Sequence, residues 1–167
     1  MNQWLKQVLL AGTSVMVMAG QVLAESMADA TNAYAAGDYA TAAKLYVPLA
    51  KQGNVEAQYN LGVMYRAGRG VPQDYNEAGK WYRLAAEQGH AIAQFNLGWM
   101  YVSGKGVAKD SVKAQMWFNI AIANAEGEMR KEFTVDRDSM AASMTAAQIA
   151  KAQELARKCA AKKFKGC

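Results

Sequence analysis

Residues 57–88 read AQYNLGVMYRAGRGVPQDYNEAGKWYRLAAEQ and align without a gap on residues 93–124, AQFNLGWMYVSGKGVAKDSVKAQMWFNIAIAN. Fourteen of the 32 aligned pairs are identical. Self-similarity at a fixed spacing is the signature of repeat folds, in which each unit packs only on its neighbours. The sequence therefore predicts a stack of units, each 36 residues long, instead of a globule around one core.

Each unit is expected to contain two helices. Apolar residues of its first half recur at helical spacing, and Gly68 follows as a left-handed helix end. Asp74 is the expected N-cap of the second helix, with Glu77 completing a capping box. Gly62 and Gly98 occupy the same position inside the first helix, where glycine costs about 1 kcal/mol relative to alanine. We therefore expect a close approach there to a bulky aromatic side chain of the partner helix.

The repeat pattern weakens on both sides of these stretches. The segment from Gly37 to Tyr46 matches the second half of the unit. After residue 124 the pattern fades, and Thr145 with Gln148 gives a second capping-box signature that opens a terminal helix through about Lys162. The expected organisation is a degenerate repeat at 25–56, repeats at 57–92 and 93–128, and C-terminal capping helices with a tail at 129–167.

These residues resemble the Sel1-like repeat, a relative of the tetratricopeptide repeat. The matching strings are AQYNLGVMYRAGRGVPQDYNEAGKWYRLAAEQG (57–89) and AQFNLGWMYVSGKGVAKD (93–110). The resemblance implies an all-α fold, an α-solenoid in which antiparallel helix pairs form a right-handed superhelix that ends in a capping helix. It also implies a protein-binding scaffold, which is the usual role of the family.

Residues 1–24 have the three parts of a secretory signal peptide. One positive charge, Lys6, precedes an apolar run from Val8 to Gly20, and Val22 and Ala24 then occupy the −3 and −1 positions. We expect cleavage after Ala24 and a periplasmic or secreted protein with no stable membrane insertion. The alternative is an uncleaved membrane anchor, although the apolar run is short for a bilayer span.

Composition argues against several classes of function. One histidine and two cysteines leave too few ligands for a zinc or iron site, and no cofactor or metal is expected. A net charge of +5 is too small to indicate nucleic-acid binding. The sole histidine, His90, falls in a turn between units, and no catalytic constellation is found. We therefore expect a monomeric protein that is not an enzyme.

The first helices of the units carry the candidate partner-binding surface. Aromatic and apolar side chains lie opposite the expected buried stripe, where a merely solvated face would be polar. In tetratricopeptide-like repeats, which the units resemble, these positions line a concave groove. The alternative is that packing between units occupies them, above all Tyr59 and Phe95. The predicted groove residues are Tyr59, Val63, Arg66, Phe95, Trp99, Val102 and, in the degenerate unit, Asn32.

The C-terminal region carries both cysteines, Cys159 and Cys167. In an exported chain an even count favours a disulfide, which would fix the tail to the last helix. Free thiols and an intermolecular bridge are the alternatives. The region is also basic, which suits a solvated helix end or a contact with an acidic partner or an anionic lipid surface. Its cations are Lys151, Arg157, Lys158, Lys162, Lys163 and Lys165.

The leading functional hypothesis is a non-enzymatic periplasmic or secreted scaffold. Its groove would bind an extended or helical segment of a partner protein, with aromatic anchors and with Arg66 orienting an acidic group. A regulatory role, through a sensor domain or an envelope assembly factor, would use the same groove. The alternative is cell-wall peptide or β-lactam binding with weak hydrolysis, as linked to a cysteine-rich branch of the family. That branch has a cysteine pair in each repeat, and these repeats have none.

Overall fold

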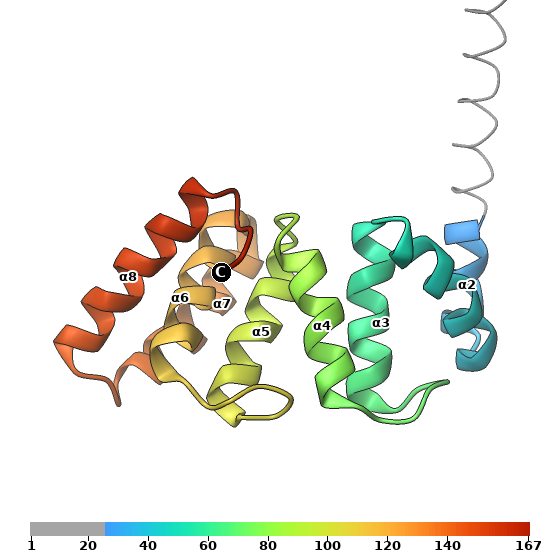
Figure 1. Ribbon diagram of the computed structural model, residues 1–167, viewed down its shortest axis with the longest axis horizontal. Helices are drawn as coiled ribbons and strands as arrows, with labels where there is room; N and C mark the ends of the chain where they lie inside the picture. Colours follow the sequence, from blue (N-terminus) through green and yellow to red (C-terminus); the bar gives the residue numbers. More distant parts are fainter. Residues whose placement is uncertain (1–25) are drawn as a thin grey trace, which may run out of the picture.

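The helices of the chain stack side by side along its longest axis (Figure 1). The computed structural model describes residues 26–167, so the expected signal peptide at 1–24 lies outside the described residues. Regular secondary structure in the described part is entirely helical, which confirms the all-α solenoid. Residues 26–35 are helical and are followed by α2 (Tyr39–Lys51), α3 (Val55–Ala67), α4 (Tyr75–Ala86), α5 (Ala91–Ser103), α6 (Ser111–Asn124), α7 (Gly127–Ala141) and α8 (Ala146–Ala161).

Two helix pairs correspond to the two aligned stretches, α3 with α4 and α5 with α6. From α2 to α7 each helix packs on the next one in the chain, and α8 packs back on α6. The buried side chains form clusters that neighbouring pairs share. The core therefore extends along the stack, as expected when one helix pair cannot bury its apolar face alone.

Glycine lets the two helices of a pair approach closely. A Cβ added at Gly62 would lie 2.5 Å from the Tyr82 ring, and one added at Gly98 would lie 2.5 Å from the Phe118 ring. Both rings are fully buried and so have little room to move. The expected close approach is confirmed, and it explains why glycine occupies a mid-helix position that alanine would otherwise favour.

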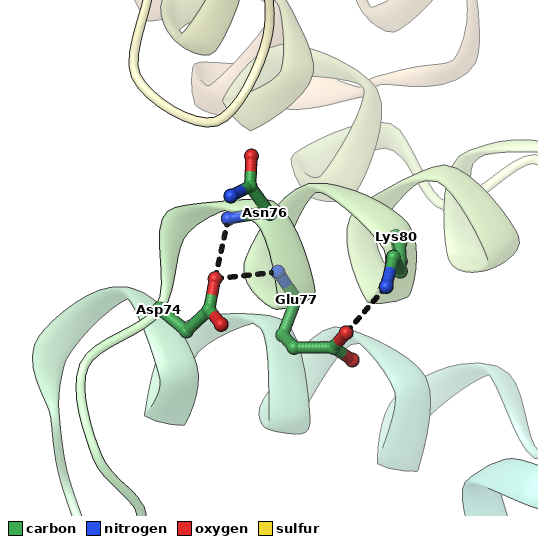
Figure 2. Close-up of polar contacts among 4 residues, drawn as sticks. All are labelled: Asp74, Asn76, Glu77 and Lys80. Carbon is green, nitrogen blue, oxygen red and sulfur yellow. Dashed lines mark hydrogen bonds and ion pairs between the residues drawn. The ribbon is translucent and has the colours of Figure 1, made fainter.

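The start of α4 confirms one half of the predicted capping box (Figure 2). Asp74 accepts hydrogen bonds from the backbone N–H groups of Asn76 at 2.8 Å and Glu77 at 3.0 Å. The second half of the prediction is wrong, because Glu77 forms an ion pair with Lys80 instead of reaching back to the cap. The N–H of Asp74 already donates to the Tyr65 carbonyl at 3.0 Å, so that donor needs no side-chain partner.

The loop between α5 and α6 closes the junction with the preceding unit. A Cβ added at Gly106, where φ is +73°, would lie 2.2 Å from the Tyr75 carbonyl oxygen. The Lys105 Nζ lies 5.2 Å from the centre of the Tyr75 ring. One unit earlier, Arg69 lies over Tyr39 at 5.3 Å. A cation–tyrosine contact therefore marks both junctions.

Buried amides connect consecutive units. Gln94 is fully buried; its amide nitrogen donates to the Ala86 carbonyl at 2.9 Å, and its oxygen accepts from Asn124 at 2.9 Å. Gln58 makes the same two kinds of bond one unit earlier, with a carbonyl at the end of α2 and with Gln88. Each such amide therefore adds a second hydrogen bond to a helix-end carbonyl, which already accepts one from the glycine N–H of the following turn, and so ties one unit to the next.

The C-terminal tail folds back onto the stack. Thr145 and Gln148 form the predicted capping box at the start of α8, with bonds of 3.2 Å and 2.9 Å. A disulfide joins Cys159, in the last turn of α8, to Cys167 in the tail. Phe164 lies between them, half-buried against the core, and its ring reaches the turn between α4 and α5. The tail therefore connects the C-terminal cap to the preceding repeats.

Candidate functional site

A pocket of about 390 Å³ opens between α3 and α5, the first helices of the two repeats. Arg66 enters it from the last turn of α3, Trp99 from α5, and Lys105 from the loop after α5. Two predicted groove residues therefore lie around one pocket with a cation from the junction loop. The full lining is Arg66, Ala67, Tyr75, Asn96, Trp99, Met100, Ser103 and Lys105.

Trp99 is the exposed aromatic side chain of this pocket. Its side chain is 41 % exposed, although two other aromatic rings pack against it. Phe95 and Phe118 meet its indole edge-on, with ring centres 6.3 Å and 5.6 Å away. A held aromatic side chain loses little conformational freedom when a ligand covers it, which is why tryptophan is frequent among the residues that dominate binding interfaces.

The pocket has positive charge. Arg66 and Lys105 line it, and its described lining contains no aspartate or glutamate. Burial raises the pKa of Tyr82 to about 12, and the positive charge of Arg66 opposes this increase. Burial also raises the pKa of Tyr59, again against the effect of Arg66. A tyrosine is already neutral at pH 7 with its ordinary pKa, and the raised pKa keeps both phenols protonated at more alkaline pH as well.

Tyr59 and Phe95 pack within the stack instead of lining the pocket. The Tyr59 ring stacks on His90, with ring centres 4.6 Å apart, and also contacts Tyr82. The Phe95 ring stacks on Phe133 of α7 at 3.9 Å. These contacts correspond to the alternative considered for both residues, in which a helix of a stack has neighbours on two sides.

The remaining predicted groove residues lie apart from the pocket. Val63 and Val102 are half-buried and pack against the core cluster of the second and third units. Asn32 is exposed in the helical segment 26–35, outside both pairs. The structure therefore brings together Arg66 and Trp99, and it does not gather the other predicted positions around the same pocket.

Six of the pocket's lining residues were not predicted from the sequence, and Lys105 and Tyr75 are the two of them that form the junction with the preceding unit. Lys105 lies between Gly104 and Gly106 in the loop that joins the two helices of its unit. A signal was present in the alignment, because a cation recurs as Arg69 and a tyrosine as Tyr39 one unit earlier. Pairing these columns could have predicted that the junction loop brings a positive charge towards the helix surface.

His90 has a structural role at the start of α5. Its Nδ1 accepts a hydrogen bond from the Ala93 N–H at 3.1 Å, and its Nε2 lies 3.4 Å from the Glu56 carboxylate. Within residues 26–167, no group of three or more histidine, cysteine, aspartate or glutamate side chains could hold a metal ion. None of the helices in this part of the chain is long and apolar enough to cross a membrane.

Comparison with known proteins agrees with this architecture. The model of the Sel1 repeat family matches residues 55–90 and 91–125. A protective antigen of uropathogenic Escherichia coli strains, which displays an SLR fold, is 29 % identical with a TM-score of 0.76. The match covers 85 % of this chain and 31 % of the antigen.

A Sel1 repeat protein from Oxalobacter formigenes is 34 % identical to this chain, with a TM-score of 0.59. The match covers 64 % of this chain and 44 % of that protein. The chain thus spans less than half the length of either of these structures. No curated protein matches the sequence. The two matched repeats, together with the stacked helix pairs that form them, show that the chain is a Sel1-like repeat protein.

Proposed function

We propose that this protein is a non-enzymatic, exported scaffold that binds a segment of a partner protein along α3 and α5. Sel1 repeat proteins are generally protein-interaction scaffolds and are typically not enzymes. The observation that carries the proposal is the exposed Trp99 in one pocket with two cations, Arg66 and Lys105. Tryptophan and arginine are among the side chains that contribute most to binding energy at protein interfaces.

The chemistry of the pocket defines the expected partner segment. An apolar side chain would cover Trp99, and a carboxylate would pair with Arg66 in a charge-assisted hydrogen bond. Two packed rings hold Trp99 in place before binding, so little ordering entropy opposes its burial by a partner. A partner with a regulatory role in the cell envelope would use the same surface.

Export is supported by the disulfide between Cys159 and Cys167, because such bonds persist in oxidising compartments. If the expected signal peptide is removed after Ala24, N-terminal sequencing of the protein purified from the periplasm or the medium will start at Glu25. A start at Met1 would contradict cleavage and favour the membrane-anchor alternative.

The groove is tested by photo-crosslinking in intact cells. Benzoylphenylalanine replaces Ser103, which lines the pocket, and as a control Leu84, which is 44 % exposed on α4 outside it. We expect a discrete adduct from position 103 and not from position 84, with mass spectrometry identifying the partner. Trp99→Ala and Arg66→Ala should each reduce that adduct while circular dichroism stays unchanged. An adduct that survives both substitutions would refute the groove assignment.

A further inference from the structure

A second pocket, of about 360 Å³, lies between α6 and α8 at the C-terminal end of the stack, where the two helices run beside each other (Figure 1). We infer that it binds a small carboxylic acid with an apolar body, whose carboxylate pairs with Arg157. This site is separate from the pocket between α3 and α5 and shares no lining residue with it. The inference therefore does not depend on the proposed partner-binding function.

Small side chains on α8 leave the space that forms the pocket. The helix is anchored to the core through Ala152 and Cys159, which are its buried residues. Ala156 and Ala160 line the pocket on the same helix, one turn apart, and neither is long enough to fill the space toward α6. The opposite wall is Ile120 of α6, which is 3 % exposed.

The tail closes one side of the pocket. Phe164 lines it, held between the disulfide-bonded residues Cys159 and Cys167. Lys163 and Phe164 have φ values of 51° and 66°, a left-handed conformation that residues other than glycine rarely adopt. Such a conformation persists only where the surrounding structure imposes it, and here the phenylalanine ring packs against the core cluster beside the pocket. The apolar wall is therefore formed before any ligand binds.

Arg157 supplies the positive charge of the pocket. It is the one charged residue among the described lining residues, and it forms no ion pair within residues 26–167. The nearby Lys151 and Lys158 both pair with Glu154, which does not line the pocket. An unpaired guanidinium beside an apolar wall suits a ligand that combines a carboxylate with an apolar body.

Asn119 contributes a polar side chain to the wall of the pocket. Its Oδ1 accepts a hydrogen bond from Arg137 at 3.4 Å, while its Nδ2 is buried and has no hydrogen-bond partner among the described residues. A carboxylate offers acceptors only, so it matches the unpaired guanidinium of Arg157 better than an alcohol or an amine does. The volume lies at the lower end of the range for small-molecule sites, about 300–1,000 Å³, which favours a small acid over a helix of a partner.

The test is a titration of the full chain with 4-phenylbutyrate, followed by amide NMR shifts, with 4-phenylbutanol as the uncharged analogue. We expect saturable shifts at Ile120, Ala156 and Ala160, and about tenfold weaker binding of the alcohol because it lacks the charge-assisted bond. Arg157→Gln should weaken acid binding to the level of the alcohol. The matched control Lys158→Gln, one residue along α8, should bind the acid as the unchanged protein does.

A pocket-filling variant separates the apolar body from the charge. Ala160→Leu adds an apolar side chain at an exposed helical position that lines the pocket, so the fold should persist and both ligands should lose affinity. Equal losses for Lys158→Gln and Arg157→Gln would mean diffuse charge attraction and would overturn the proposal. Equal affinity for acid and alcohol, or no saturable shifts in α6 and α8, would overturn it as well.

Discussion

Single side chains set the spacing between helices in this molecule. Gly98 faces the Phe118 ring, which is fully buried, so any added atom would have to displace a ring that cannot move. Gly79 of α4 is also buried and helical, but its nearest neighbour is the terminal methyl of Met100, 3.1 Å from an added Cβ. Methionine is flexible and can shift by a few tenths of an ångström. Gly98 is therefore required by the close approach of a rigidly packed ring, whereas Gly79 is not, although both glycines lie inside helices.

Gly98→Ala is expected to destabilise the stack, whereas Gly79→Ala is expected to be neutral or stabilising. Overpacking against Phe118 costs about 1–3 kcal/mol, which exceeds the gain of about 1 kcal/mol in helix propensity. At Gly79 alanine brings the same gain in helix propensity, and the Met100 side chain can shift to avoid the added methyl group. Urea unfolding followed by circular dichroism measures both variants. A Gly98→Ala protein as stable as the unchanged one would mean that the helices can separate without cost.

At the scale of the helix, starts and ends are determined locally and contacts between units are not. Gly68 ends α3 in the left-handed conformation, as its place after an apolar stripe predicts. The sequence predicted wrongly that Glu77 accepts a hydrogen bond from the Asp74 N–H. That N–H donates instead to the Tyr65 carbonyl across the loop, and no local sequence pattern predicts the path of this loop. No local pattern predicts the role of the buried Gln94, since its partners come from two other helices.

Asp74→Ala should destabilise the protein by about 0.5–2 kcal/mol, the usual cost of losing an N-cap side chain. Its carboxylate accepts two backbone N–H bonds, which would be left without a protein partner. Glu77→Gln is the matched control, because its partner Lys80 is exposed and such ion pairs contribute little. Thermal unfolding of the two variants distinguishes the residues. Equal losses would indicate that Glu77 shares the capping role after all.

For the whole molecule, the repeat pattern predicted the stack of helix pairs but not how the C-terminal helix packs on it. The solenoid, its two central pairs and a terminal helix followed from residues 57–124 and from the capping box at Thr145. The packing of α8 on α6 was not predicted, because no repeat pattern extends into α8. In the candidate site, Arg66 and Trp99 were found from helical angles. The same angles also selected Tyr59 and Phe95, because one sequence position cannot tell a groove from a neighbouring helix.

Alkylation tests the bond that closes the tail. Protein purified without reductant should take up no alkylating agent at Cys159 or Cys167, and after reduction it should take up one group at each, as read by intact mass. The Cys159→Ser, Cys167→Ser double variant should keep its helical content, because the bond closes only a short terminal loop. Alkylation of both thiols before reduction would show that the cysteines are free.

The cation–tyrosine junctions affect where a further repeat can be added to the array. Each junction needs a tyrosine at the start of one second helix and a cation with glycine in the following loop, as Tyr75 provides for Lys105. At the next position along the chain the tyrosine is replaced by Ser111. If the unit 57–92 were duplicated in tandem, the protein would gain one more complete cation–tyrosine junction. A copy of the unit placed after α6 would have no tyrosine ring for its loop cation to contact. Duplication within the array therefore keeps the cation–tyrosine contact at each junction, whereas a unit added after α6 lacks it.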